Sequence, residues 1–414
     1  MVDRNGSPFT VKQMVELDAC VRCELCREAC SMYQLLGENP HPLGFPTSSS
    51  GMIRQFRTII RSQFGLKAKF LGRKPAIGEG LWRLADALFL HCTTCGRCRV
   101  SCPLGIDTWS LVNSMREYFM NGYTSQYPEH CAVELVDTVH GTIQRSGNIF
   151  ALPNSSRRDW ADYTGAEVKL KEKAKVVYFT GCVSSFQGRA QDIAHAITAI
   201  LNHVGEDWTL LQDEWCCGHP LAVSGAANRA KTTAEHNIKA IEEVGAKLVV
   251  TGCPGCYLAL KQECPKILGR SPNFQALHST QLLDTYVREG RLEIPKFDED
   301  ATYHDPCELA RLGGVVGEPR RILKAITREL REPRGPGMDG ICCGQGGLLK
   351  ATNPSLAESL TAKRLEMLAE TRANLILSAC PTCVQGFGRI ATDQNNGLRV
   401  MDVSELVARQ LGLM

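Results

Sequence analysis

Two pairs of adjacent cysteines, each followed by glycine, stand out among the 20 cysteines of this chain of 414 residues. Cys216 and Cys217 lie in WCCGHP, and Cys342 and Cys343 lie in ICCGQGG. A chain this long needs no disulfides for stability, and its first segment, MVDRNGSPFT, lacks the apolar stretch and cleavage site of a secretory signal. We therefore expect a cytoplasmic protein whose cysteines bind metal.

The composition is that of an ordinary globular protein, with 43% hydrophobic and 22% charged residues, and the length suits two or three domains. A net charge of +3 is too small to indicate nucleic acid as a partner. No apolar run reaches the roughly 18 residues that a membrane-spanning helix needs, so none is predicted.

Eight cysteines form two compact quartets with the spacing C-x2-C-x2-C-x3-C: Cys20, Cys23, Cys26 and Cys30, then Cys92, Cys95, Cys98 and Cys102. This spacing resembles that of bacterial two-cluster ferredoxins, in which the fourth cysteine of one run binds the cluster of the other. It predicts two cubane [4Fe–4S] clusters, one on Cys20, Cys23, Cys26 and Cys102 and one on Cys92, Cys95, Cys98 and Cys30. Zinc is the alternative, but zinc sites use two separated cysteine pairs. Ser31 follows Cys30 where the ferredoxin motif has proline, so the motif does not predict the geometry of the turn after Cys30, although the ligand itself is present.

Between the quartets, residues 52–74 carry seven basic side chains and no acidic one. Apolar and basic residues recur on different faces of a predicted helix: Ile53, Phe56, Ile60 and Phe64 on one, Arg54, Arg57 and Arg61 on others. Such a helix packs on its own chain or on a partner, or it lies on an anionic membrane surface.

From about residue 173, short apolar runs alternate with amphipathic segments, which predicts an α/β fold. The order is strand 174–182, helix 188–205, strand 207–211, helix 226–245 and strand 246–256. The segments 301–307, 318–330, 340–347, 354–371 and 373–383 repeat this order. In both series cysteines follow the carboxyl ends of strands, where the sites of α/β proteins lie.

The cysteines of the two series align at offsets of 125 to 127 residues, which indicates an internal duplication. Each copy supplies five: Cys182, Cys216, Cys217, Cys253 and Cys256 in the first, and Cys307, Cys342, Cys343, Cys380 and Cys383 in the second. Five soft ligands exceed the need of one zinc ion or one cubane, and adjacent thiolates can hold neighbouring irons of a more open cluster. The glycines beside the pairs either leave room for inorganic sulfur or substrate, or simply turn the chain.

The pattern C-x33-C-C-x35-C-x2-C, then C-x34-C-C-x36-C-x2-C, resembles the tandem cysteine-rich CCG domain of the heterodisulfide reductase superfamily. Two ferredoxin quartets precede this domain, and with them the chain resembles the D-type subunits of that superfamily, which serve anaerobic energy metabolism. The resemblance extends from about residue 15 to about residue 395. It is also similar to the K subunit of the sulfite-reduction-associated transmembrane complex and, more distantly, to glycolate oxidase and glycerol-3-phosphate dehydrogenase iron–sulfur subunits. The expected architecture is a mostly helical ferredoxin-like domain (1–130, with an insertion at 31–91), a connecting segment (131–172), and two α/β CCG domains (173–295 and 296–414) related by pseudo-twofold symmetry, an α+β and α/β fold overall.

The resemblance implies that each set of five cysteines binds a non-cubane [4Fe–4S] cluster and that the two clusters face each other. In those relatives a disulfide is thought to be cleaved between the clusters, each sulfur binding an iron, with electrons arriving from the cubanes. His219 and His304 either donate protons to the products or hydrogen-bond backbone around the clusters. Cys131 and Cys264 lie outside every motif and are expected to be buried apolar residues.

Two functions remain open at this point. The first is a catalytic subunit that reduces or forms a disulfide or protein trisulfide, and that attaches to the cytoplasmic membrane through a cytochrome b or quinone-linked partner, with further redox subunits. Its thiol substrate is a small molecule or a small sulfur-carrier protein. The second is an electron-transfer subunit of a flavin-dependent 2-hydroxy-acid or glycerol-3-phosphate dehydrogenase. The chain has no G-x-G-x-x-G motif after a strand, so the flavin would belong to another protein.

Overall fold

A computed structural model describes residues 9–36, 49–59, 61, 79–122, 131–395 and 397–414. The chain divides into two compact units. Unit 1 comprises Met1–Asp137, Val223–Ala226 and Gly344–Leu360, and unit 2 comprises Thr138–Ala222, Ala227–Cys343 and Thr361–Met414. Two short segments that follow the cysteine pairs in the sequence therefore belong to unit 1.

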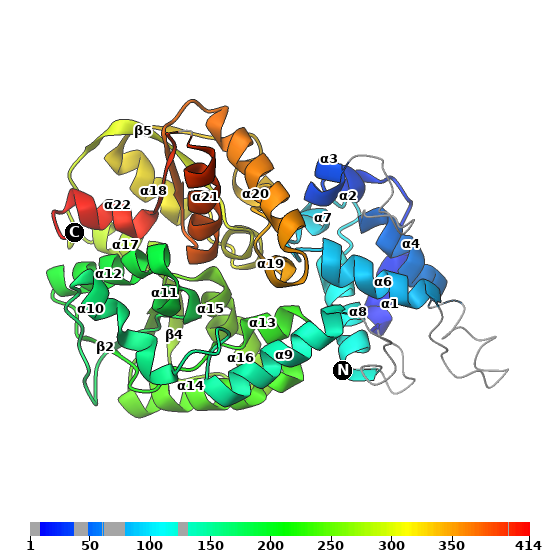
Figure 1. Cartoon of the computed structure of the whole chain (residues 1–414), viewed down its shortest axis with the longest axis horizontal. Coiled ribbons are helices and arrows are strands. Elements are labelled where there is room, and N and C mark those ends of the chain that lie inside the picture. The colour runs from blue at the N-terminus through cyan, green and yellow to red at the C-terminus, as the bar shows by residue number, and fades with distance from the viewer. Residues whose placement is uncertain (1–8, 37–48, 60, 62–78, 123–130, 396) are drawn as a thin grey trace. The chain divides into compact units, whose positions relative to one another are not determined.

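Unit 1 is helical in its described residues (Figure 1). Its helices are α1 (Val11–Ala19), α2 (Leu25–Glu28), α3 (Ser31–Leu36), α4 (Ser49–Ile59), α6 (Glu79–His91), α7 (Arg97–Val100), α8 (Thr108–Gly122), α19 (Leu349–Thr352) and the first turns of α9 (Cys131–Ser146) and α20 (Pro354–Ala369). Thr10 begins α1 with a capping box, in which the Thr10 side chain accepts the backbone N–H of Gln13 and the Gln13 side chain accepts that of Thr10.

Buried Arg116 on α8 holds the late segments of the chain in unit 1. Its guanidinium donates to four backbone carbonyls, those of Leu88, Cys92, Val223 and Gly347, at 2.6 to 3.3 Å. A side chain at Gly347 would collide with the backbone of Thr93, so this approach requires glycine. The Arg116 cation thus ties the segments after both cysteine pairs to the second ferredoxin quartet.

The basic helix predicted between the quartets is described over its first half, as α4. Three of its apolar side chains are buried: Ile53, Phe56 and Ile59. Arg57 and Arg61 pair with Asp18, and Arg54 pairs with Glu24. The described turns therefore pack on their own unit, as one of the two alternatives expected, while Ile60 and Phe64 lie outside the described residues.

Unit 2 contains two parallel four-stranded sheets with matching strand orders. The first has the order β2-β1-β3-β4, and the second has the order β6-β5-β7-β8. The strands of the first are β1 (Val176–Tyr178), β2 (Trp208–Leu210), β3 (Leu248–Thr251) and β4 (Gln275–His278); those of the second are β5 (Phe297–His304), β6 (Thr327–Arg331), β7 (Leu375–Ser378) and β8 (Arg399–Asp402). Neither β4 nor β8 was expected from the sequence, and residues 327–330, expected to end a helix, belong instead to β6.

Helices cover both faces of each sheet. In the first copy they are α10 (Trp160–Thr164), α11 (Cys182–Phe186), α12 (Gly188–His203), α13 (His219–Val223), α14 (Lys231–Val244), α15 (Pro254–Leu258), α16 (Cys264–Leu268) and α17 (Ser279–Arg288). In the second copy they are α18 (Gly317–Ile326), α20, α21 (Pro381–Gln394) and α22 (Val403–Gln410). Short turns are η3 (Asn154–Arg158), η4 (Ala227–Ala230), η5 (Ala259–Glu263), η6 (Glu308–Leu312) and η7 (Gly337–Asp339), of which η5 and η6 are π-helical.

The burial pattern of β1 shows why these strands read as continuous apolar runs. Val176 and Tyr178 point into a core that extends into the second copy, whereas Val177 and Phe179 pack against α14. Both faces are buried, as expected for parallel sheets.

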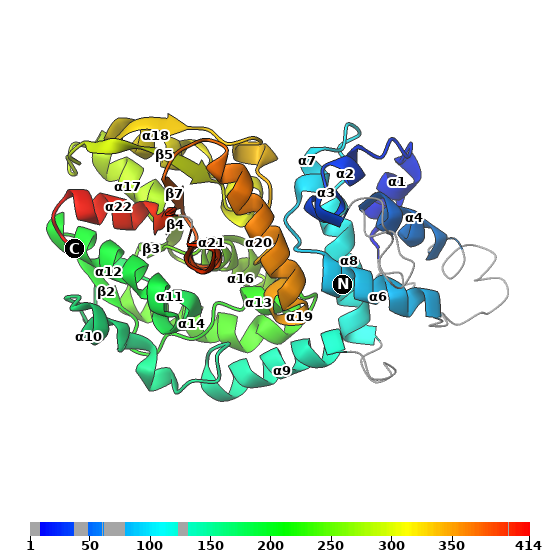
Figure 2. The ribbon, with the colours of Figure 1, turned by 45° about the horizontal axis from the view of Figure 1, so that its top comes forward.

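The two copies pack reciprocally. Helix α12 of the first lies against α22 of the second, and α17 of the first lies against α18 of the second (Figures 1 and 2). These are equivalent pairs exchanged between copies, which is the signature of a twofold relationship. The α/β fold with pseudo-twofold duplication is therefore confirmed.

Candidate metal centres

The eight ferredoxin cysteines surround two cavities in unit 1. One is lined by Cys20, Cys23, Cys26 and Cys102, together with Ile53, Pro103 and Ile106. The other is lined by Cys30, Cys92, Cys95 and Cys98. Each cavity thus receives three cysteines of one quartet and the fourth of the other.

The loops around these cavities repeat an uncommon backbone conformation. Arg22 and Glu24 in the first quartet have φ near 60°, and Thr94 and Gly96 occupy the same positions in the second with φ of 52° and 72°. Left-handed conformations are costly for residues other than glycine and persist where the surroundings impose them. Alternating αR and αL residues aim successive N–H groups into a concavity, as at many iron–sulfur sites. The backbone fits cubane clusters.

Side chains around the second cavity also suit bound thiolates. The Thr108 hydroxyl donates to Cys98 Sγ at 2.9 Å, and Thr94 N donates to Cys92 Sγ at 3.4 Å. Burial raises the pKa of Cys30 to about 12, because the thiolate is costly there without a positive partner. A metal would supply that charge.

In the first CCG copy, five cysteines gather at the carboxyl edge of the sheet. Cys182 follows β1, the adjacent pair follows β2, and the remaining two flank the start of α15 after β3. Side-chain contacts join Cys182 to Cys216, Cys217 to Cys256, and Cys256 to Cys253. The chain passes from β1 to β2 on one side of it and then from β2 back across β1 to β3 on the other side, so the cysteines occupy the switch point of the sheet.

In the second copy, the cysteines gather in the same way. Cys307 contacts Cys342, Cys343 Sγ lies 3.2 Å from Cys383 Sγ, and Cys383 contacts Cys380. The neighbouring sulfur of Cys342, and then burial, raise the pKa of Cys307 well above its usual value. The same crowding and burial raise the pKa of Cys383. A metal would supply the positive charge that holds such buried sulfurs as thiolates, so the donor set fits a soft-metal cluster.

The glycines next to the cysteines serve two different purposes. A side chain at Gly181 would come within 2.8 Å of Cys256 Sγ, so that glycine leaves room for a ligand sulfur. Gly218 and Gly344, which follow the pairs, have φ of +85° and +84°, and their side chains would strike Ala230 and Leu360. The glycine of each CCG motif therefore serves a turn packed against a helix.

His219 links the two CCG copies. Its Nδ1 lies 2.9 Å from Glu263 Oε1, and its Nε2 lies 3.1 Å from Glu308 Oε1. The carboxylates come from the π-helical turns η5 and η6, one in each copy; such turns are frequent at functional sites. Burial opposes a charge on the ring, but Glu263 and Glu308 outweigh it and raise the pKa of His219 well above its usual value.

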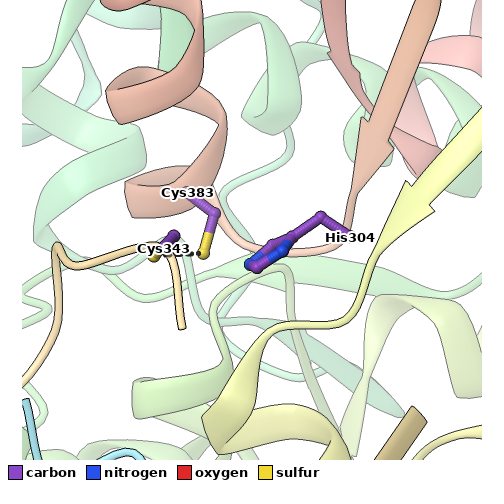
Figure 3. A group of neighbouring side chains, drawn as sticks. All are labelled: His304, Cys343 and Cys383. Carbon is purple, nitrogen blue, oxygen red and sulfur yellow. Dashed lines mark hydrogen bonds between the residues drawn. The ribbon is translucent and has the colours of Figure 1, made fainter. Parts of the chain in front are cut away.

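His304 lies in the second copy beside two cysteines of its set. Its ring and the sulfurs of Cys343 and Cys383 lie within 4.8 Å of one another (Figure 3). Arg364 Nε donates to its Nδ1 at 3.4 Å, which leaves the hydrogen of a neutral ring on Nε2. Burial, and then the charge of Arg364, lower the pKa of His304 well below its usual value.

The remaining two cysteines belong to neither set of five. Cys264 is buried in α16, where its Sγ lies 3.9 Å from the carbonyl oxygen of Cys217. Cys131 begins α9, and its side chain is outside the described residues. Sequence reasoning missed three side chains near the sulfurs, namely Arg157, Glu214 and Glu308. The sequence offered a clue only for Glu214 and Glu308, because each is a charged residue within two positions of a motif cysteine. Nothing in the sequence near Arg157 points to the cysteines.

Comparison with known proteins agrees with this construction. Residues 176–261 and 301–387 match the cysteine-rich CCG domain, and residues 16–106 match the 4Fe-4S dicluster domain. Fold and site together define an iron–sulfur redox protein with a duplicated CCG domain. The chain belongs to the family of D-type heterodisulfide reductase subunits. It is 32% identical to the D-type subunit of the dihydromethanophenazine:CoB–CoM heterodisulfide reductase of Methanosarcina barkeri, over 98% of this chain and 96% of that one.

More distant similarity extends to other proteins. The EtfAB:quinone oxidoreductase of Syntrophomonas wolfei is 25% identical over 97% of this chain, which covers 59% of that protein. A crystal structure of a hypothetical protein from Helicobacter pylori shares the fold, with a TM-score of 0.58 at 9% identity over 98% of this chain and 73% of that one. Among the described residues, no helix combines the length and the apolar character that spanning a bilayer requires.

Proposed function

We propose that this chain is the catalytic iron–sulfur subunit of a heterodisulfide reductase-like redox complex, in which it reduces or forms a disulfide or protein trisulfide. The observation that carries the proposal is the gathering of two complete five-cysteine sets, one at each sheet edge, in one compact unit. A chain that only relayed electrons would not need five soft ligands twice.

The proposal assigns four clusters. Two cubane [4Fe–4S] clusters take the crossed ligand sets Cys20, Cys23, Cys26 and Cys102, and Cys92, Cys95, Cys98 and Cys30; what supports this is the lining of the two cavities. Two non-cubane [4Fe–4S] clusters take Cys182, Cys216, Cys217, Cys253 and Cys256, and Cys307, Cys342, Cys343, Cys380 and Cys383. We also propose four functional segments: the ferredoxin-like domain 1–130, the connecting segment 131–172, and the CCG domains 173–295 and 296–414.

When bound, such clusters supply single electrons and iron that binds thiolate sulfur. The chain itself supplies a buried setting around the sulfurs and polar groups that orient them. Disulfide reduction takes up two electrons and two protons. We assign His219, which bridges Glu263 and Glu308, to proton delivery between the copies. We assign His304 to hydrogen bonding around the second set of cysteines.

The proposed partner is a membrane cytochrome b or quinone-interacting subunit, through which the chain attaches to the cytoplasmic face of the membrane. The name of the Methanosarcina barkeri relative, which pairs dihydromethanophenazine with a CoB–CoM heterodisulfide, supports this choice. So does the quinone named for the Syntrophomonas wolfei relative.

The test uses the purified complex under anaerobic, oxidising conditions. We expect a paramagnetic cluster signal to change when coenzyme M thiol, coenzyme B thiol or a reduced sulfur-carrier protein is added, and not when a methylated thioether of the same compound is added. No change with any of the thiols would overturn the proposal.

The alternative is an electron-transfer subunit of a flavin-dependent 2-hydroxy-acid or glycerol-3-phosphate dehydrogenase, and similarity to EtfAB:quinone oxidoreductase favours it. It predicts co-purification with a flavoprotein and retention of activity when Cys216 and Cys217 are replaced by serine. The disulfide proposal predicts loss of activity in the same variant.

A further inference from the structure

Arg157 is a charged side chain buried beside the first set of cysteines. It belongs to η3, in the stretch 131–172 expected only to connect the two halves of the chain. Its side chain is 5% exposed, and that of its partner Glu214 is 3% exposed. Because burying an ion pair is costly, so deep a pair calls for a local reason.

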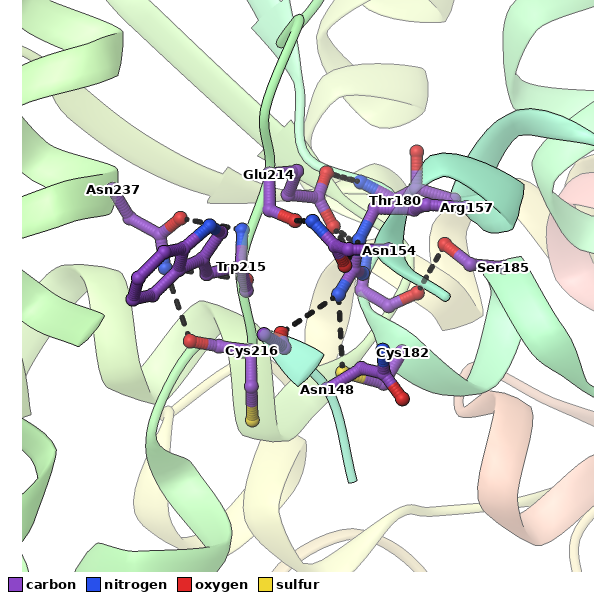
Figure 4. A network of polar contacts seen from close by, with 12 residues as sticks. Asn148, Asn154, Arg157, Thr180, Cys182, Ser185, Glu214, Trp215, Cys216 and Asn237 are labelled. Carbon is purple, nitrogen blue, oxygen red and sulfur yellow. Dashed lines mark hydrogen bonds and ion pairs between the residues drawn. The ribbon is translucent and has the colours of Figure 1, made fainter. Parts of the chain in front are cut away.

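The contacts of Arg157 point toward the sulfur of Cys182 (Figure 4). Nη1 pairs with Glu214 Oε1 at 3.0 Å, while Nη2 donates to the carbonyl of Gly147 at 3.1 Å and to Cys182 Sγ at 3.7 Å. The guanidinium carbon also lies 5.2 Å from the ring centre of Phe186. The same Gly147 carbonyl accepts the backbone N–H of Cys216 at 2.6 Å.

Glu214 is held on the far side of this pair. It accepts the backbone N–H groups of Thr180 and Gly181, both at 2.8 Å. Burial opposes the charge on Arg157, but Cys182 and then Glu214 outweigh it and raise its pKa, so the guanidinium stays charged. The Arg157 guanidinium therefore faces the sulfur of Cys182, and the Glu214 carboxylate is stabilised by two backbone N–H groups.

The second copy is built differently at the equivalent place. Gly340 stands where the first copy has Glu214, at the same offset that relates the cysteine pairs. Arg311, whose charge acts on Cys307, donates to the backbone carbonyls of Met338 and Gly340. The copies thus offer their sulfurs different polar surroundings.

We propose that Arg157 is a positioning residue of the first cluster, donating a hydrogen bond to the Cys182 sulfur and raising the reduction potential of that cluster. The physical reason is that hydrogen bonds to ligand sulfurs and nearby positive charge stabilise the more negative, reduced cluster. The inference rests on the proposed assignment of Cys182 as a cluster ligand.

A direct test needs no mutation. The complex is prepared with arginine labelled with 15N in its guanidinium, reduced with dithionite, and examined by pulsed EPR for nitrogen coupling. We expect coupling to one of the two non-cubane signals; the Cys343→Ser variant, which keeps only the first set intact, identifies that signal. Absence of arginine coupling from the first-set signal would overturn the proposal.

Redox titration of the same complex tests the effect on potential. Arg157→Gln should lower the midpoint potential of the first cluster and leave that of the second unchanged, and Arg157→Lys should restore part of the shift. The matched control is Arg158→Gln, because Arg158 is the next residue and donates to the carbonyl of Gln212, outside the sulfur set. This variant should shift neither midpoint potential.

Iron and sulfide content separates the outcomes. If all variants keep their clusters and Arg157→Gln shifts no potential, the inference fails while the proposed function stands. If Arg157→Gln and Arg157→Lys both lose the first cluster and no nitrogen coupling is seen in the unaltered complex, Arg157 is merely structural. If the unaltered complex lacks non-cubane signals, the proposed function itself fails.

Discussion

The two CCG copies share a scaffold but differ in the charged residues around their sulfurs. Strand order, five cysteines, the positive φ of the glycine after each pair and the reciprocal helix packing are the same in both. In the first copy a buried glutamate pairs with Arg157, which donates to Cys182 Sγ, whereas in the second a buried aspartate, Asp305, pairs with Arg320. Duplication therefore preserved the geometry that ligation requires, while the electrostatics of the two sites diverged.

A second contrast concerns the strand that leads to each site. Phe179, directly after β1, stands where His304 ends β5, and Ile238 stands where the second copy has Arg364. An apolar pair in one copy thus corresponds to a polar pair in the other. Under the proposed function, the two centres handle the two halves of one disulfide, so a difference of this kind between them is expected.

The largest effect should come from removing the adjacent cysteines of one copy at a time. Replacing Cys216 and Cys217 by serine, or Cys342 and Cys343, should remove one cluster and lower disulfide activity by at least about 100-fold, because direct ligands matter more than supporting residues. Iron analysis, EPR and turnover of the complex measure this. Cys264→Ala is the control and should keep both clusters. Retained activity in either double variant would show that one copy is dispensable.

A smaller effect is expected from the buried carboxylates. Glu214→Ala leaves Arg157 buried without its carboxylate and should cost about 3–5 kcal/mol of unfolding free energy. Asp305→Ala should cost less, toward the lower end of that range, because Arg320 keeps Glu332 as a partner. Anaerobic urea unfolding of the loaded protein measures both.

The exposed pair of Asp207 with Lys171 provides the control for these carboxylates, and Asp207→Ala should change stability little. An equal loss in Glu214→Ala and Asp305→Ala would show that the two networks are equivalent in stability after all.

Exchanging the polar pair of the second copy for the apolar pair of the first should have an intermediate effect. His304→Phe removes an acceptor from buried Arg364 and should cost about 1–3 kcal/mol. Adding Arg364→Ile removes the donor as well, so the double variant should be more stable than the sum of the single changes by roughly 1 kcal/mol. Strict additivity in this double-mutant cycle would contradict a direct coupling of the two side chains.

The smallest effect concerns the caps of equivalent helices. His278 caps α17 and Asp402 caps α22. Burial lowers the pKa of His278 to about 4 and raises the pKa of Asp402 to about 7. Neutral His278 stabilises the fold above its ordinary value of 6.5, and this contribution is lost as pH falls through 4. Protonated Asp402 stabilises the fold below 3.8, and this contribution is lost as pH rises through 7.

The two slopes oppose each other, so the native protein should depend weakly on pH over this range. Asp402→Asn should make stability rise more with pH, and His278→Asn should make it fall more, as measured by unfolding at a series of pH values. Glu405, whose pKa is raised to about 8, and the nearby charges of Asp192 and Arg409 act on the α22 site as well. Identical pH profiles in both variants would contradict opposite titration.

Much of the architecture was readable along the chain, because ligand spacing and strand periodicity are local properties. The offsets between Cys182 and Cys307, and between the adjacent pairs, were enough to predict a duplicated α/β unit, and that prediction is confirmed. The short edge strands β4 and β8 escaped notice because four half-buried residues make little pattern. Residues 327–330 were expected to continue a helix but belong to β6, which pairs with β5, so sheet formation overrode local propensity.

The sequence by itself determined which residues could bind metal, since cysteines at short fixed spacings within each quartet, and at matched offsets in the two copies, mark ligand sets whatever lies around them. Only the tertiary structure decided what stands beside those thiolates. Arg157 reaches Cys182 across 25 residues, Arg116 reaches Gly347 across 231, and His219 joins carboxylates of both copies. Such contacts depend on how sheets and helices pack, and packing is a property of the whole fold that no local spacing encodes.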